Sequence, residues 1–167
     1  MNRNFIVAVT ALAVALPAVA MAQGKNTLVG TWSLVSVVSK TEKGEVNSAL
    51  YGPKPKGFVT YTADGRMSVV LAEDGRKALS VNDRVSAPME EKAQAFSTMN
   101  AYAGTYIFSG DKVVHHVEVA SVPNWVGTNQ ERTVKMQGDR VTLSTPPLSR
   151  GGVMHTIELT WERVKPR

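Results

Sequence analysis

The sequence lacks cysteine altogether, and its lysines and arginines form no run of five or more. Absence of cysteine excludes a disulfide framework and a lipid-acylated cysteine, so the fold must be stabilised by an apolar core. The basic residues occur singly or in pairs, and no stripe suited to phosphate backbones is present. Nucleic acid is therefore not an expected partner.

Long hydrophobic runs are also missing, except at the N-terminus. Residues 1–22 have a basic Arg3, an uncharged run over positions 5–16 and a final Ala-Met-Ala, which is the order of a secretory signal peptide. A membrane anchor needs about 20 apolar residues. We therefore expect a cleaved signal, no integral membrane segment after cleavage, a periplasmic or secreted protein, and one domain over 23–167.

What the remaining chain does contain is period-2 alternation in short segments separated by Gly and Asp turns. The turns at 63–65, 110–111 and 138–139 suit tight hairpins. Closure into an eight-stranded antiparallel up-and-down barrel removes the exposed edges of such a sheet, and its interior is filled by side chains or holds one small ligand. The eight predicted strands are Leu28–Lys40, Gly57–Thr62, Arg66–Leu71, Gly104–Ser109, Lys112–Ser121, Gln130–Gln137, Arg140–Thr145 and Val153–Val164.

One segment departs from the alternation. Between the third and fourth strands, residues 86–101 carry Met89, Ala93, Phe96 and Asn100 at helical spacing, with acidic residues near the start. This pattern predicts a short amphipathic helix.

Polar side chains are expected inside the barrel. Alternation places His115 on the apolar face of its strand and His116 on the other, and it places His155 and Arg132 on inward faces of theirs. A buried arginine is costly unless it is paired, so Arg132 indicates either a wet cavity or a structural clamp.

The roles of these residues stay open at this level. His115 fits a hydrogen-bonded interior histidine, a ligand contact, or a proton-transfer group. Arg132 fits capture of a ligand carboxylate or oxygen, or bonding to internal backbone, and Trp125 fits a plug of the barrel end or a stacking surface. No metal site is expected, because His116 and Glu118 on one strand face lack a third ligand.

The chain resembles the lipocalin-like domain family of small bacterial and fungal proteins, within the calycin group of ligand-binding barrels. The resemblance covers nearly all of residues 23–167. The motifs that carry it are LVGTWSLVS (28–36), YTADGRMS (61–68), AYAGTY (101–106), the block from HHVE (115–118) through PNWVG (123–127) to QER (130–132), and LSTPP (143–147).

The resemblance implies an eight-stranded barrel closed at its base by Gly30 and Trp32 of the first strand, with Arg163 of the last strand against the indole. The chain departs from secreted animal lipocalins in lacking cysteine and in having a helix between the third and fourth strands, and we expect this helix to act as a lid over the barrel mouth. Lipocalins carry small apolar molecules, whereas some lipocalin-like barrels of microbial pathways are isomerases or cyclases.

Three functions remain as hypotheses, none needing a cofactor. The first is an exported barrel that binds a small apolar or amphipathic ligand through polar contacts from Tyr61, Tyr106, His115, Arg132 and His155, with Trp125 nearby. The second is a cofactor-free isomerase, cyclase or hydrolase, in which His115 or His155 moves a proton and Arg132 stabilises an oxyanion. The third is a packed barrel that binds another envelope protein by its surface. The sequence leaves the oligomeric state open.

Overall fold

The structure is a computed structural model that describes residues 27–48 and 50–165, so the predicted signal peptide lies outside the described residues. It contains ten strands, one α-helix and one short 3-10 helix within those ranges. Their bounds are β1 Gly30–Thr41, β2 Val46–Asn47, β3 Lys56–Tyr61, β4 Arg66–Ala72, α1 Met89–Ser97, β5 Met99–Phe108, β6 Lys112–Ala120, η1 Pro123–Trp125, β7 Asn129–Gln137, β8 Arg140–Ser144, β9 Leu148–Arg150 and β10 Val153–Arg163.

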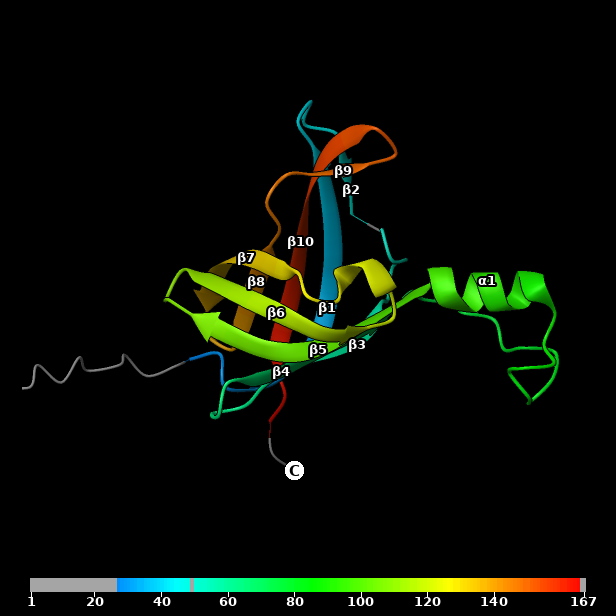
Figure 1. Cartoon of the computed structure of the whole chain (residues 1–167). Helices are drawn as coiled ribbons and strands as arrows, with labels where there is room; N and C mark the ends of the chain where they lie inside the picture. The colour runs from blue at the N-terminus through cyan, green and yellow to red at the C-terminus, as the bar shows by residue number, and fades with distance from the viewer. Residues whose placement is uncertain (1–26, 49, 166–167) are drawn as a thin grey trace, which may run out of the picture.

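The strands form one antiparallel sheet that closes on itself (Figure 1). Its order is β2-β1-β3-β4-β5-β6-β7-β8-β10-β9, and β1 pairs in addition with β10. Omitting the short β2 and β9, which flank the ends of β1 and β10, leaves a closed ring of eight strands. The predicted eight-stranded antiparallel barrel is confirmed.

Alternation along the strands separates core from surface. In β4, for example, Met67, Val69 and Leu71 are buried and the residues between them are exposed. Fully burying an aliphatic side chain of this size stabilises the fold by about 1.5–3 kcal/mol. The largest buried side chains are Trp32 near the start of β1 and Trp161 near the end of β10, on the two strands that close the barrel.

Trp32 and Arg163 join these two strands at the barrel base. They are cross-strand partners, and the guanidinium carbon of Arg163 lies 3.9 Å from the centroid of the indole. Arg163 also donates hydrogen bonds to the carbonyl oxygens of Val29 at 2.9 Å and Thr27 at 2.6 Å. A cation on an aromatic face that also binds backbone oxygens ties the segment before β1 to the end of β10.

Gly30 lies beneath this contact. Its φ of +129° is a conformation that other residues rarely adopt, and a Cβ at this position would lie 2.8 Å from Nη1 of Arg163. The Trp32 indole is also held at its edge, because its Nε1 donates to the Leu28 carbonyl at 2.8 Å. Position 30 therefore requires glycine, because the Arg163 side chain packs directly against its backbone.

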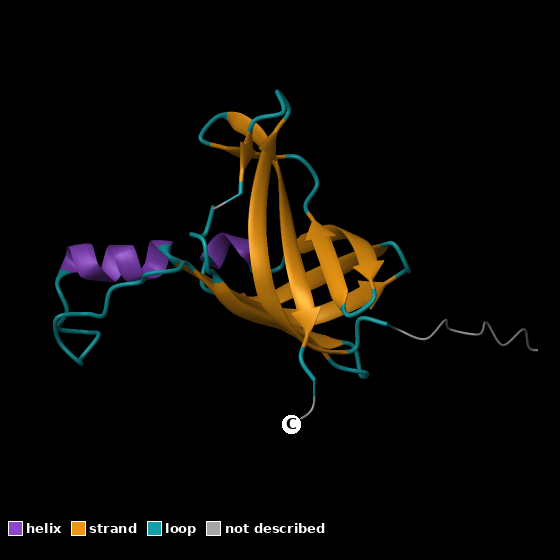
Figure 2. Ribbon diagram, turned by 180° about the vertical axis from the view of Figure 1, so that it is seen from behind, coloured by secondary structure: helices purple, strands orange, loops and turns teal. Residues whose placement is uncertain are grey.

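The predicted helix exists, but two expectations about it were wrong. α1 ends at Ser97, and Asn100 lies in β5, because the ladder with β4 begins at the pair Ala72 and Met99. The helix also projects away from the barrel (Figure 2), and Met89 and Phe96 are 79% and 55% exposed. None of its residues lines the barrel cavity, so α1 is not a lid over it.

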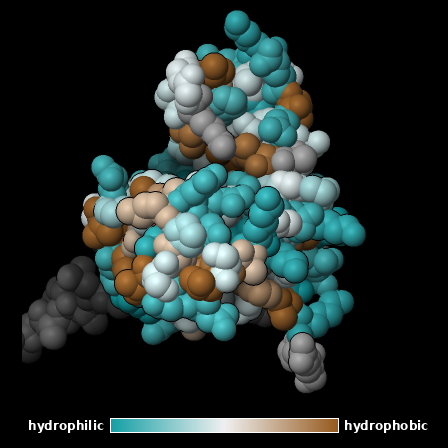
Figure 3. Space-filling view, turned by 90° about the vertical axis from the view of Figure 1, so that its right-hand side faces the viewer, coloured by the Kyte–Doolittle hydropathy of each residue, from teal (hydrophilic) through white to brown (hydrophobic). Residues whose placement is uncertain are grey.

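The outer surface carries hydrophobic side chains interspersed with hydrophilic ones (Figure 3). On β3, β4 and β6 these include Phe58, Val70 and Val119, which are exposed. Within residues 27–48 and 50–165, no helix has the length and apolar character needed to span a membrane.

Replacing Arg163 should weaken the closure. We expect Arg163→Ala to lower the free energy of unfolding by about 2 kcal/mol, because the cation–π contact and the charged hydrogen bonds are both lost. Urea unfolding would measure the change. Arg140→Ala is the matched control, since its ion pair with Glu162 is exposed and should contribute less than about 1 kcal/mol. Equal stability of the two variants would contradict the assignment.

Candidate binding cavity

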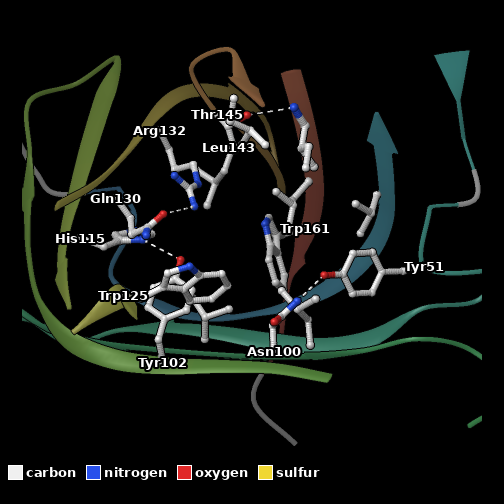
Figure 4. Close-up of a pocket in the computed structure, with 16 residues that line it drawn as sticks. Tyr51, Asn100, Tyr102, His115, Trp125, Gln130, Arg132, Leu143, Thr145 and Trp161 are labelled. Atoms are coloured by element: carbon white, nitrogen blue, oxygen red, sulfur yellow. Dashed lines mark hydrogen bonds between the residues drawn. The ribbon is translucent and has the colours of Figure 1, made fainter. Parts of the chain in front are cut away.

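The barrel encloses a cavity of about 360 Å³ (Figure 4). This volume lies within the range of small-molecule pockets, about 300–1,000 Å³. The lining combines aliphatic, aromatic and a few polar side chains, namely Val37, Tyr51, Val69, Leu71, Asn100, Tyr102, His115, Trp125, Gln130, Arg132, Leu143, Thr145, Leu148, Ile157, Leu159 and Trp161.

Aromatic rings form part of its wall. Tyr102 of β5 and Trp125 of η1 meet edge to face, with ring centroids 5.9 Å apart. Trp161 of β10 also lines the cavity. Trp125 therefore contributes directly to the cavity wall, where an aromatic ring provides a large apolar contact.

His115 connects two tyrosines beside the cavity. The imidazole is 1% exposed, with its Nε2 2.7 Å from the hydroxyl of Tyr61 and its Nδ1 3.0 Å from that of Tyr102. A neutral imidazole has one donor and one acceptor nitrogen, so each tyrosine hydroxyl has a complementary partner. The three side chains form one hydrogen-bonded chain from the core to the cavity.

Burial keeps the side chains of His115, Tyr61 and Tyr102 uncharged. The pKa of His115 is lowered to about 3, first by burial and then by the nearby charge of Arg132. Burial raises the pKa of Tyr61 well above its ordinary value and also raises that of Tyr102. All three groups are neutral at physiological pH.

Arg132 is the cation of the cavity. From β7 it donates to the Glu131 carbonyl at 2.6 Å and to Oε1 of Gln130 at 3.2 Å (Figure 4). No aspartate or glutamate is among the described residues that line the cavity, and none of the ion pairs among the described residues includes Arg132. The guanidinium charge thus faces an otherwise neutral wall.

Trp161 presents a second donor. Its side chain is 1% exposed, and its Nε1 has no hydrogen-bond partner among the described residues. Buried polar groups are normally paired, so the indole N–H of this cavity-lining residue is an unsatisfied donor within the described structure.

The structure brings three of the predicted contact residues to the cavity wall, namely His115, Trp125 and Arg132. Tyr61 and Tyr106 lie deeper, with ring centroids 4.8 Å apart, and the Tyr106 hydroxyl donates to the Thr62 carbonyl at 2.9 Å. Tyr61 therefore reaches the cavity through His115, and Tyr106 packs behind Tyr61.

His155 lies outside the cavity. It pairs across the sheet with Thr41 and Leu148, where β1 and β10 extend past the other strands toward β9 (Figure 1), and its Nδ1 lies 2.8 Å from the Ser39 hydroxyl. Alternation gives the face on which a residue lies but not its depth along the barrel. His155 and His115 do not share one cavity.

Several lining residues were not predicted as contacts, among them Tyr102, Trp161 and Asn100. Tyr102 continues the inward parity of Tyr106, but the predicted strand began only at Gly104 and so left Tyr102 out. Trp161 was placed on the inward face but without a polar role. Asn100 donates to the Tyr51 hydroxyl, a contact between residues far apart in sequence.

Outside the barrel, His116 and Glu118 bind different partners. The His116 Nδ1 lies 3.0 Å from Oδ1 of Asn129, and Glu118 forms an ion pair with Arg66 at 2.9 Å. In the part of the chain that the structure describes, no three His, Asp or Glu residues gather as a metal site would require.

Comparison with known proteins identifies the family to which this barrel belongs. The profile of the lipocalin-like domain matches residues 29–164, which is most of the chain. The protein belongs to the lipocalin-like domain family. The predicted resemblance is confirmed, and the match includes both strands of the closure and every residue of the cavity wall.

Two known proteins are similar to this chain. A protein of Aspergillus oryzae named 4'-hydroxy-3'-methoxypropiophenone carrier protein is 35% identical over 107 residues, covering 59% of this chain and 96% of the relative. A crystal structure of a lipocalin-like protein from Bacteroides uniformis is 11% identical, with a TM-score of 0.43, over 82% of this chain and 98% of the other.

The buried imidazole should make stability depend on pH. Because the folded pKa of His115 is about 3 and an ordinary histidine has 6.5, the unfolded chain binds the proton first, and stability is lost as the pH falls below 6.5. Below that pH, the free energy of unfolding of the wild type should fall by up to about 1.4 kcal/mol per pH unit more than that of His115→Gln, because glutamine does not titrate. Urea titrations between about pH 6 and pH 4 would test this. Parallel curves for the two proteins would contradict it.

Proposed function

We propose that this protein binds a small amphipathic molecule inside its barrel and acts as a carrier. The observation that carries the proposal is the interior cavity of about 360 Å³, whose mainly apolar wall includes the Arg132 guanidinium and the Trp161 indole N–H. A few polar groups on an apolar wall orient a ligand without chemistry. A fully packed barrel would leave no such space.

The Aspergillus oryzae relative supports the carrier role and suggests the kind of ligand. Its name describes a carrier of a phenyl ketone that bears hydroxyl and methoxy groups. The cavity of the present protein has rings of Tyr102, Trp125 and Trp161 on its wall, which suit an aromatic body. We infer that an aromatic or similarly flat apolar molecule is the preferred cargo.

The state of His115 favours binding over proton transfer. Both imidazole nitrogens already face tyrosine hydroxyls, and the pKa lowered to about 3 keeps the ring neutral at physiological pH. A general acid or base works best with a pKa near the working pH. His115 is better suited to orienting the Tyr102 hydroxyl toward a ligand.

The cavity should bind the neutral fluorescent probe N-phenyl-1-naphthylamine with a stoichiometry of one per chain. Ile157→Trp should weaken this binding at least about tenfold, because the larger ring fills the cavity. Fluorescence titration measures both values.

Thr156→Trp is the matched control, since the neighbouring position on β10 faces the other side of the sheet. It should bind the probe like the wild type. Absence of probe binding by the wild type would overturn the carrier proposal.

We also propose export, on the basis of the signal-like residues 1–22. Expressed in a Gram-negative host, the protein should appear in the periplasmic fraction with an intact mass that begins at Gln23. Replacing the apolar run by introducing Leu12→Arg and Val14→Arg should retain the full-length chain in the cytoplasm, because the translocated segment must be hydrophobic. A full-length wild-type chain in the cytoplasm would contradict export.

A further inference from the structure

Two donors on the cavity wall have more hydrogen-bonding capacity than the protein uses. A guanidinium carries five N–H donors, and Arg132 donates to the Glu131 carbonyl and to the Gln130 side chain. The Trp161 N–H has no partner among the described residues, although its side chain is almost fully buried. Both side chains line the same cavity (Figure 4).

The charge of the cavity is also unbalanced. Arg132 carries the positive charge of a guanidinium, while His115 is neutral at physiological pH and no carboxylate is found among the described lining residues. A cation against an apolar wall is costly to desolvate unless an anion accompanies it. A neutral cargo would cover the guanidinium without supplying that anion.

We propose that the cargo is an apolar carboxylic acid, bound as its carboxylate by Arg132, and that the Trp161 N–H donates to an oxygen of the same molecule. This inference rests on the proposed carrier function and names its ligand class. The planar guanidinium fork matches the two oxygens of a carboxylate. Tyr102, whose hydroxyl lies 3.0 Å from Nδ1 of His115, lines the same cavity and remains neutral.

The requirement for a carboxylate is tested with two ligands of nearly the same shape, one charged and one neutral, that displace bound N-phenyl-1-naphthylamine. In the wild type, 4-phenylbutyrate should displace the probe at least about tenfold more strongly than 4-phenylbutyramide, the usual advantage of a charge-assisted hydrogen bond. In Arg132→Gln the ratio should fall below about two, and Arg132→Lys should give an intermediate ratio because it keeps the charge but loses the fork.

Arg140→Gln is the matched control, because it removes one positive charge from an exposed position on β8 outside the cavity. It should keep the wild-type ratio. Far-UV circular dichroism establishes that each variant is folded. The displacement ratio of the two ligands in the wild type does not depend on the folding of any variant.

Trp161→Phe tests the second donor. It keeps an aromatic ring and removes the N–H, so affinity for 4-phenylbutyrate should fall at least about threefold more than affinity for 4-phenylbutyramide, since a charged acceptor gains more from the donor. Equal losses for the two ligands would overturn the role of Trp161.

The outcomes separate this inference from the carrier function. If the wild type binds N-phenyl-1-naphthylamine but both displacing ligands compete equally, the carboxylate inference is overturned and the carrier proposal stands. If the probe itself does not bind, the carrier proposal fails. A wild-type ratio near ten that survives Arg132→Gln would overturn the assignment of Arg132.

Discussion

Closure of the sheet between β1 and β10 is the constraint on which the rest of the molecule depends. An open sheet of these strands would expose two edges and have no enclosed interior. The contact of Arg163 with Trp32, together with its hydrogen bonds to Val29 and Thr27, holds the closing strands at their base. With that end secured, the interior can contain both a packed core and a cavity.

The boundary between core and cavity is formed by polar side chains that satisfy one another. His115 pairs with Tyr61 on the core side and Tyr102 on the cavity side. Such groups can be buried because each finds a partner and none carries charge. The cavity lining differs from these paired groups, because Arg132 is charged and the Trp161 N–H has no partner among the described residues. The groups available to a ligand therefore lie on the cavity side of the His115 hydrogen bonds.

Particular residues show how far sequence reasoning reached. The eight barrel strands were predicted within a few residues, apart from β5, because alternation and hairpin turns are local signals. The helix was predicted to end four residues beyond its actual end at Ser97, since pairing of Met99 with Ala72 prevailed over helical spacing. His155 was placed on the correct strand face, yet it lies beyond the cavity. Tyr102 was missed because it fell between the predicted helix, which ended at residue 101, and the predicted strand, which began at Gly104.

The barrel, its family and the inward-facing side chains could be predicted from the amino-acid sequence, since they follow from period-2 alternation, turn residues and motifs. The tertiary structure alone decided which inward groups meet. Tyr61, Tyr102 and His115 come from β3, β5 and β6, and their contact depends on strand register and on the β-bulge between Ala103 and Gly104. The same holds for the projecting helix and the unpaired Trp161 donor. Depth along a barrel and the pairing of polar groups arise from contacts between distant segments, which no local pattern encodes.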